Sequence, residues 1–473
     1  MPEFHGEPYV YLAGLTHDSA LIAWGAFYFR VKERNGIYKL LDAQDMEPAL
    51  RETIGRRSTP YGTARVVVRD ASGAEAATAR VFDANHCWVS GLKPDTEYTY
   101  QIFVAPTKKR SAAGTEEEWA KGERWDWAIR DDHANLYPGG HYDNRFRTFP
   151  DPAQPASSFS FAVIGDFGVG IRRPSGDDHR QREVADALRI AVHDYDARFL
   201  LTTGDNIYAG SRFLWITGSE GDEDDDWFFT YFQPYRYILN RIPVYPCIGN
   251  HDTAELESPD DRDQLMDNLY LRERFAGEEK YGRASIGPGL FYRFRFGRDA
   301  EFVAIDTSKE SFFSERLFEV PKHLDFIQCA FSPIAADAPR WRVPFAHHPP
   351  FCAGPLHRNT GSMSRLLPIF EQAGVQAMFC GHEHNFQHSR CRGIDYFITG
   401  GAGKVRQGRP SKSGFEDAHT VSWAGTFNFL IVTIDGGRML VHPLTERDGH
   451  PEPLVRFSPA GESISGPAEI TLR

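Results

Sequence analysis

The chain has 473 residues, of which 41% are hydrophobic and 13% aromatic, enough apolar material for two folded domains. Its formal net charge of −12 argues against a nucleic-acid-binding surface, because such surfaces are basic. No apolar run is long enough to cross a membrane, and the first residues lack the basic-then-apolar order of a signal peptide. The six scattered cysteines show no metal-binding spacing, and we expect most of them to be buried thiols. We therefore expect a cytoplasmic protein, or an exported one if a leader was removed.

Residues 1–150 alternate apolar and polar side chains in short runs separated by turn residues. Such alternation predicts an antiparallel β-sandwich, with strands at Ser19–Trp24, Ala64–Asp70 and Tyr98–Val104. A stretch at about 107–144 is too long for a hairpin loop and is interpreted as an insertion between the last two strands.

Residues 151–159 are rich in proline, serine and alanine and are interpreted as a linker. In residues 160–473 the pattern changes to apolar strands that alternate with loops and a helical stretch at 180–190. This order predicts a layered α/β domain whose ligands bind at the carboxyl ends of its strands. The expected strands are Phe159–Ile164, Arg198–Thr203, Phe302–Ile305, Arg342–Ala346, Ala377–Cys380 and Tyr396–Thr399.

Four of these strands, and a fifth apolar run at Val244–Pro246, lead into a tight turn that carries residues suited to bind a metal. In chain order the turns read GDFG, GDNIY, GNHD, HHPP and GHEH, beginning at Gly165, Gly204, Gly249, His347 and Gly381. We expect the glycines before Asp205, Asn250 and His382 to let the backbone bend and aim those side chains inward.

Each turn by itself is weak evidence. A lone Asp after a strand is usually a helix cap, and two histidines two residues apart on a strand share a face without needing a metal. Five such turns at one edge of a sheet are together strong evidence for a metal cluster. Carboxylate, phenolate, amide and imidazole groups fit two ions about 3.5–4 Å apart, a spacing used in phosphoryl transfer.

The ordered set of turns resembles the calcineurin-like metallophosphoesterases, and Tyr208 resembles the distinguishing tyrosine of the purple acid phosphatase family. The resemblance covers about residues 159–445 and implies a four-layer α/β/β/α sandwich. VSGLKPDTEYTYQIFV resembles the end of a fibronectin type III domain, as expected in front of that family's larger members.

The resemblance also implies site residues. The first metal site, which holds Fe(III) in this family, would use Asp166, Asp205, Tyr208 and His384. The second, which takes Fe(II), Zn(II) or Mn(II), would use Asn250, His347 and His382, with Asp205 bridging both ions.

Around these ligands the resemblance places His251 and His357 beside the substrate. We expect His348 to face away, Glu383 to point away and serve structure, and Asp252 to orient His251 or cap a helix. The run Thr399–Lys404 lacks phosphate-loop spacing, so close backbone packing is the better account of its glycines.

The predicted function is hydrolysis of small phosphate monoesters, of acid phosphatase type, by in-line attack of a metal-bound hydroxide on phosphorus. A phosphodiesterase or nucleotide pyrophosphatase on the same site remains an alternative. Its second ester arm could contact Ser211–Asp226 or the three tryptophans of the insertion (Trp119, Trp125, Trp127), although such aromatics more often pack against their own domain. A non-catalytic binding module is a remote alternative, because no expected ligand is missing.

Overall fold

The computed structural model describes residues 4–32, 37–40, 63–82, 84–104, 123–124, 143–171, 176–177, 179–208, 227–253, 265–275, 291–308, 321–332 and 339–472. The chain divides into two compact units. The first comprises Met1–Asp151 and Tyr235–Pro243, and the second Pro152–Pro234 and Val244–Arg473. Among the described residues, no helix has both the length and the apolar character needed to span a membrane.

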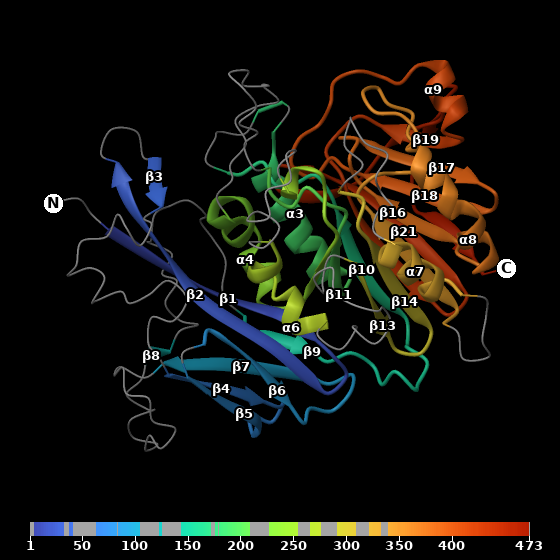
Figure 1. Cartoon of the computed structure of the whole chain (residues 1–473). Coiled ribbons are helices and arrows are strands. Elements are labelled where there is room, and N and C mark those ends of the chain that lie inside the picture. Colours follow the sequence, from blue (N-terminus) through green and yellow to red (C-terminus); the bar gives the residue numbers. More distant parts are fainter. Residues whose placement is uncertain are drawn as a thin grey trace. The chain divides into compact units, whose positions relative to one another are not determined.

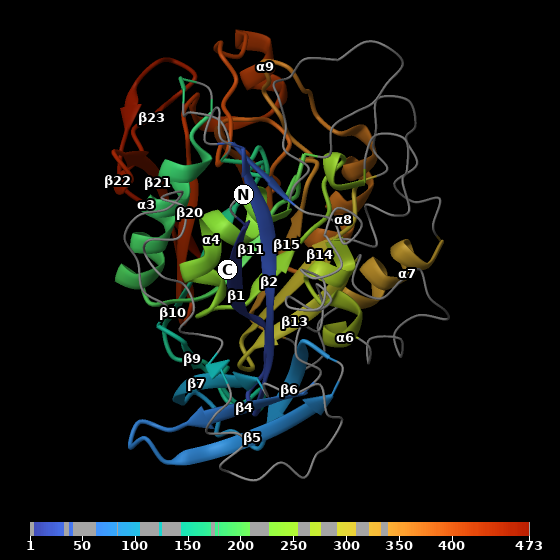
Figure 2. The same cartoon turned by 90° about the vertical axis from the view of Figure 1, so that its left-hand side faces the viewer.

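The first unit is built from two antiparallel sheets, drawn mostly in blue in Figure 2. One sheet contains β1 (Phe4–Leu15), β2 (Ser19–Lys32), β3 (Ile37–Leu40) and β6 (His86–Ser90). The other contains β5 (Glu75–Phe82), β4 (Thr63–Arg69), β7 (Glu97–Val104), β8 (Glu123–Arg124) and β9 (Arg145–Arg147). In strand β7 the alternation of apolar and polar residues matches the burial, because Tyr98, Tyr100 and Ile102 are buried and the residues between them are not. The predicted β-rich character of this region is confirmed.

A tyrosine fixes the turn that leads into β7. Tyr98 stands at the start of the strand, and its hydroxyl oxygen accepts the backbone N–H of Lys93 at 2.9 Å. The hydroxyl of Thr148, near the C-terminal end of this domain's sequence, donates to the Lys93 carbonyl at 2.6 Å and so stabilises the same turn. A tyrosine that bonds back to the preceding backbone in this way is a recurrent device of β-sandwich domains.

The second unit contains two larger sheets. A seven-stranded sheet has the order β12 (Val244–Pro246), β11 (Ala197–Thr202), β10 (Phe159–Ile164), β20 (Phe429–Asp435), β21 (Arg438–Arg447), β22 (His450–Pro453), and β25 (Ala468–Thr471) also pairs with β21. A nine-stranded sheet has the order β13 (Tyr292–Phe296), β14 (Ala300–Ile305), β15 (Trp341–Ala346), β16 (Ala377–Cys380), β18 (Ile394–Thr399), β17 (Phe386–Cys391), β19 (Thr420–Ala424), β23 (Arg456–Phe457), β24 (Ser463–Ile464). Strand β10 lies between β11 and β20, and Figure 1 shows this green strand beside the red C-terminal part of the sheet.

Aromatic side chains fill the space between these two sheets. Phe161 of β10 lies against Phe199 of β11, and also against Phe302 of β14 and Phe379 of β16, with ring centroids 5.0–6.1 Å apart. Each of these strands is buried on both faces, which explains why its sequence is mostly apolar and does not alternate.

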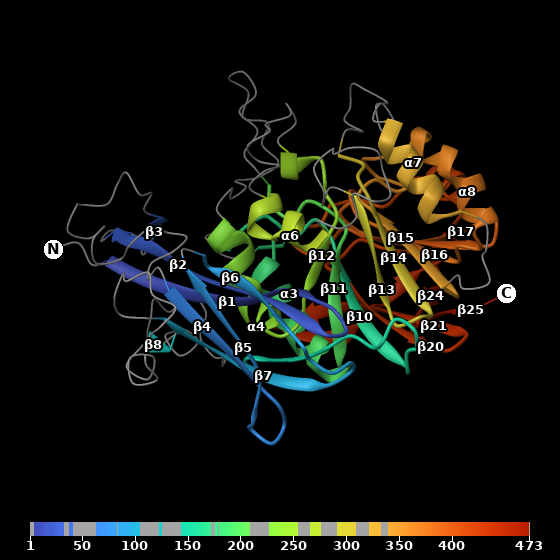
Figure 3. The same ribbon diagram turned by 60° about the horizontal axis from the view of Figure 1, so that its bottom comes forward.

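Helices cover the outer faces of both sheets. Helix α3 (Gln181–Asp194) contacts β11, β20, β21 and β22, as Figure 2 shows. Helices α7 (Pro321–Ala330) and α8 (Leu367–Gln372) share an apolar core with β14, β15, β16 and β18. In Figure 3 the two helices lie above β14, β15 and β16. The predicted layered α/β domain is confirmed. The remaining helical segments are Phe228–Phe232 (π), α4 (Gln233–Leu239), His251–Thr253 (3-10), α6 (Leu271–Phe275), Gly361–Leu366 (3-10) and α9 (Lys412–Asp417).

Candidate metal centre

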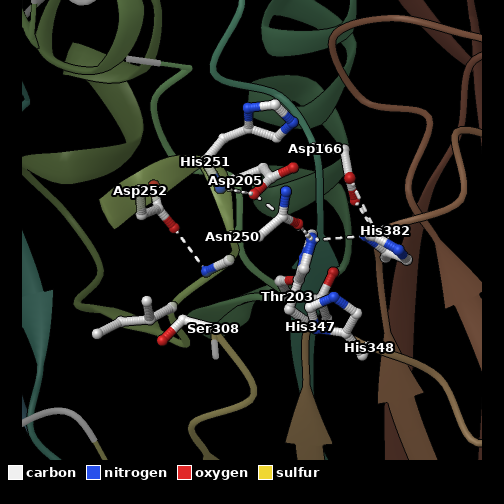
Figure 4. Close-up of polar contacts among 12 residues, drawn as sticks. Asp166, Thr203, Asp205, Asn250, His251, Asp252, Ser308, His347, His348 and His382 are labelled. Atoms are coloured by element: carbon white, nitrogen blue, oxygen red, sulfur yellow. Dashed lines mark hydrogen bonds and ion pairs between the residues drawn. The ribbon is translucent and has the colours of Figure 1, made fainter. Parts of the chain in front are cut away.

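The metal-type residues lie at the carboxyl ends of parallel strands. Strands β10, β11 and β12 run parallel in one sheet, and β14, β15, β16 and β18 run parallel in the other. Because the ends of parallel strands meet at one edge, the turns after them converge. Figure 4 shows Asp205, Asn250, His347 and His382 pointing toward one another, with Asp166 beside His382.

The ligand residues themselves carry the backbone strain of these turns. Asp166, Asp205 and His382 have positive φ angles of 55°, 51° and 74°. The glycines in these turns also permit close approach of neighbouring groups. A Cβ on Gly249 would lie 2.1 Å from Oδ1 of Asp205, and no side-chain adjustment there keeps Asp205 in place. Of the three glycines expected to let the backbone bend, Gly204 has a positive φ of 90°, whereas Gly249 and Gly381 do not.

Three donor atoms form a first group. The Tyr208 hydroxyl oxygen lies 3.1 Å from Nε2 of His384 and 3.5 Å from Oδ1 of Asp166, and the His384 nitrogen is 3.4 Å from the same carboxylate oxygen. All three residues are buried. Atoms at these separations can share one metal ion.

His347 is the centre of a second group. Its Nδ1 lies 2.8 Å from the Thr203 carbonyl, which can only accept, so a neutral ring carries its proton there and leaves Nε2 bare. That bare nitrogen faces Oδ1 of Asn250 at 2.9 Å, Oδ1 of Asp205 at 3.5 Å and Nδ1 of His382 at 3.2 Å. The bare nitrogen and the two oxygens present lone pairs to one another, and a cation among them would relieve their repulsion. The residues therefore fit a metal ion.

Electrostatics support the same reading. Burial raises the pKa of the Asp166 carboxyl well above its usual value, and the adjacent Asp205 adds to the rise. Burial acts in the same direction on Asp205, but the neighbouring imidazoles of His347 and His251 bring its pKa below the usual value. Burial lowers the pKa of the His347 imidazole. A buried pair of carboxyls among neutral imidazoles is a favourable place for positive ions.

His251 and His357 lie at the edge of these groups, and both are half-buried. The backbone N–H of His251 donates to Oδ1 of Asp205 at 3.1 Å, and its ring centroid is 4.6 Å from that of Tyr208. The His357 ring lies 3.8 Å from the ring of His382, centroid to centroid. The structure therefore brings together every residue that the sequence proposed for the site.

His348 is a residue whose placement sequence reasoning missed. One of its ring nitrogens lies within 4.8 Å of ring nitrogens of His347 and His382, so its ring faces the cluster instead of pointing away. Thr307 holds it there, because the Thr307 hydroxyl oxygen accepts the His348 backbone N–H and also lies 3.0 Å from Nδ1. The doubled histidine was a visible signal, but the Thr307 contact could not be seen in the sequence.

The contact of Lys404 with Tyr208 was also not predicted from the sequence. The Lys404 side chain is buried, and Nζ lies 3.9 Å from the centroid of the Tyr208 ring. An ammonium group over an aromatic face is attracted by the ring, more strongly where water is excluded. The run before it packs closely, as expected, because a Cβ on Gly403 would lie 2.6 Å from the Phe167 carbonyl oxygen.

Asp252 ties two of the turns together. Its buried carboxylate accepts the backbone N–H groups of Gly249 and Ile207 at 2.8 and 2.9 Å, and the Asn206 side-chain amide at 2.9 Å. The structure thus shows it bonded to the turns after β11 and β12 rather than to the His251 ring. The tryptophans of the insertion and Ser211–Asp226, suggested above as a rim, lie outside the described residues.

Comparison with known proteins identifies the class. Residues 159–386 match the calcineurin-like phosphoesterase family. Two solved structures have a similar fold over nearly the whole chain. A structure of PhoD has a TM-score of 0.58 at 11% identity and covers 97% of this chain and 92% of its own. The purple acid phosphatase PPD1 from yellow lupin (Lupinus luteus) seeds has a TM-score of 0.56 at 14% identity, covering 95% and 73%. Residues 159–386 therefore form a calcineurin-like phosphoesterase domain.

The sequence relatives include tartrate-resistant and purple acid phosphatases. The tartrate-resistant acid phosphatase type 5 of Rattus norvegicus is 26% identical over 305 residues, which cover 61% of this chain and 86% of the rat protein. Purple acid phosphatase 4 of Arabidopsis thaliana is 26% identical over 272 residues, which cover 53% and 69%. The predicted relationship to the purple acid phosphatases is confirmed, and the chain is a phosphoric ester hydrolase.

Proposed function

We propose that the chain hydrolyses small phosphate monoesters at a two-metal centre, as an acid phosphatase. The observation that carries the proposal is the pair of donor groups described above, which are joined by Asp205. Ligand atoms of Asp166, from the first group, and of Asp205 and His347, from the second, all lie within 4.8 Å of one another. No residue of the expected ligand set lies elsewhere, which argues against a degenerate, non-catalytic domain.

The donor chemistry of the two groups differs and suggests different metals. Asp166, Asp205, Tyr208 and His384 offer carboxylate, phenolate and one imidazole, a set that suits Fe(III). Asn250, His347 and His382, with Asp205 shared, offer an amide oxygen and two imidazoles, which suit Fe(II), Zn(II) or Mn(II). When bound, two such ions stabilise charge on phosphoryl oxygens and make water more acidic.

The chain's own residues supply orientation and proton transfer. Thr203 fixes the tautomer of His347, and Asp252 keeps the turns after β11 and β12 in register. His251 and His357 stand half-exposed beside the buried donors, where an imidazole N–H can bind a phosphoryl oxygen or give a proton to the leaving alkoxide. These roles assign substrate contact to the two histidines and leave the buried residues to hold metal.

The iron assignment predicts a colour. A tyrosinate bound to Fe(III) absorbs visible light, so the iron-loaded protein should be purple, and Tyr208→Phe should lose the visible band. Absorption spectra with iron analysis of both samples check this. A band that survives in Tyr208→Phe would defeat the ligand assignment, and a colourless, active, metal-replete wild type would mean that other metals occupy the site.

The substrate class is tested with nitrophenyl phosphate and bis-nitrophenyl phosphate across pH, with iron and zinc or manganese supplied. The bridging position of Asp205 makes Asp205→Asn the matched blank. We expect the monoester to be cleaved much faster than the diester. Faster diester cleavage would move the chain to the phosphodiesterases, and turnover no greater than the blank on both would contradict the proposed activity.

For the first unit we propose a fibronectin type III-like domain. The support is its two antiparallel sheets and the Tyr98 hydroxyl that closes the turn before β7. Tyr98→Phe should lower the stability of this unit by about 1 kcal/mol and leave the metal content unchanged.

A further inference from the structure

We propose that Glu383 and Arg406 are positioning residues that hold the His357 ring at the edge of the metal centre. The inference rests on the proposed function, because His357 acts there as a substrate contact. It assigns a purpose to a buried carboxylate and a nearby guanidinium that the metal ligands do not use.

Glu383 anchors the backbone of His357. The glutamate lies between His382 and His384 in the turn after β16, and its side chain is fully buried. Its Oε2 accepts the His357 backbone N–H at 2.7 Å. The segment that carries His357 is therefore fastened to the same turn that carries two proposed metal ligands.

Arg406 reaches both partners. Its backbone N–H donates to the His384 carbonyl at 3.0 Å, so its own position is also set by that turn. Its Nε lies 3.6 Å from Oε1 of Glu383, and its Nη2 lies 3.5 Å from Nε2 of His357. The Arg406 side chain is 18% exposed and that of Glu383 0%, so water screens this pair little.

The contact with Arg406 also selects a tautomer of His357. A guanidinium can only donate, so Nε2 of His357 accepts, and a neutral ring carries its proton on Nδ1. Packing against His382, at 3.8 Å between centroids, limits the tilt of the same ring. The neighbouring Arg358 instead donates to the Ala353 carbonyl at 3.0 Å. Orientation and proton position of His357 thus both depend on Arg406.

A double-mutant cycle tests whether Arg406 acts through His357. We would measure kcat and KM for nitrophenyl phosphate in wild type, Arg406→Ala, His357→Ala and the double variant. Arg406→Ala should lower kcat/KM by about tenfold, the usual scale for a lost orienting partner. In the His357→Ala background the same change should cost less than about twofold. Equal losses in both backgrounds, or no loss in the first, would overturn the proposal.

Further variants separate orientation from charge and from folding. Arg406→Lys keeps the charge but loses the planar fork, so it should recover only part of the loss, whereas full recovery would contradict the tautomer argument. Glu383→Gln should reduce kcat/KM, and adding it to Arg406→Ala should cost little more. Arg438→Ala, which removes an exposed ion pair with Glu469 on β21 and β25, is the matched control and should match wild type.

Binding of inorganic phosphate to the metal-loaded protein gives a readout without turnover. Calorimetry should show phosphate binding weakened in Arg406→Ala and His357→Ala, and no further weakening in the double variant. Additive weakening would overturn the proposal. Failure of the proposed function looks different, because wild type would then show neither turnover nor phosphate binding.

Discussion

At the residue scale, three residues of the candidate metal centre have a strained backbone conformation. Asp166, Asp205 and His382 adopt left-handed φ angles, which side chains other than glycine rarely take. Such strain costs on the order of 1–3 kcal/mol for each residue and persists where the surroundings enforce it. Here the enforcing contacts include the His382 backbone N–H, which donates to both carboxylate oxygens of Asp166 at 3.1 and 2.8 Å.

Close approach at Gly249 leads to a prediction. Gly249→Ala places a methyl group against the Asp205 carboxylate, so this proposed shared ligand must move, and metal content measured by mass spectrometry should fall sharply. Gly361→Ala is the control, because no atom lies within 4 Å of its added Cβ and its φ is not positive. Full metal content in Gly249→Ala would show that Asp205 is not a shared ligand.

The sequence could predict those residues of the candidate site that lie in the turns directly after strands. Asp205 and Tyr208 share one turn, so their proximity was already implied by the motif. The roles of His348 and Lys404 were not, since each depends on a partner far along the chain, Thr307 for one and the Tyr208 ring for the other. Single-sequence reasoning identifies residue types at turns, but it does not determine which distant side chains meet them.

At the element scale, Asp252 acts as a clamp between the turns after β11 and β12. We predict that Asp252→Ala lowers the free energy of unfolding of the second unit by about 2–4 kcal/mol, because three buried donors lose their acceptor. Denaturant titration measures the loss. Asp194→Ala, at the exposed end of α3, should change it by less than about 0.5 kcal/mol.

Metal content distinguishes a clamp from a simple stabiliser. Since the two turns carry Asp205, Tyr208 and Asn250, Asp252→Ala should also reduce metal content under conditions where the protein is still folded. A folded variant with full metal content and a large stability loss would contradict the proposal that this carboxylate orders the site.

Strands predicted from sequence agree with the structure where burial is two-sided. Ala377–Cys380 is β16 as predicted, and Phe159–Ile164 is β10. Both are short apolar runs ended by glycine, a pattern with few other interpretations. Sheet order could not be predicted in the same way. Strand β20 pairs with β10 across most of the second unit's sequence, and nothing local in either strand specifies that partner.

At the scale of the whole molecule, the two units are not consecutive in the chain. The first unit takes in Tyr235–Pro243, nine residues from between two of the proposed metal-binding turns. Within that unit the Tyr100 hydroxyl donates to the Asn240 carbonyl at 2.8 Å, and the Asn240 amide donates to Asn144 at 2.9 Å. The proline-rich linker read from the sequence is therefore one of several crossings between the units.

A truncated chain tests the weight of this arrangement. Residues 152–473 alone retain Tyr235–Pro243 but lose Tyr100 and Asn144, so buried polar groups around Asn240 lose their partners. At equal metal content, we expect the melting temperature of the truncated chain to lie several degrees below that of the full chain. Each lost kcal/mol lowers the melting temperature by about 4 °C or more in a small domain, and by less in a larger one. Calorimetry of both chains measures the difference, and equal melting temperatures would contradict the prediction.

The same discontinuity bears on how such chains can be recombined. Val244, the first residue of β12, follows directly on the segment assigned to the first unit, and β12 leads to Asn250. A gene fusion that exchanges the front domain at the linker would carry over a nine-residue segment matched to the discarded domain. A compatible chimera must exchange Met1–Asp151 and Tyr235–Pro243 together. We therefore expect that the front domain is not readily replaced as an independent module.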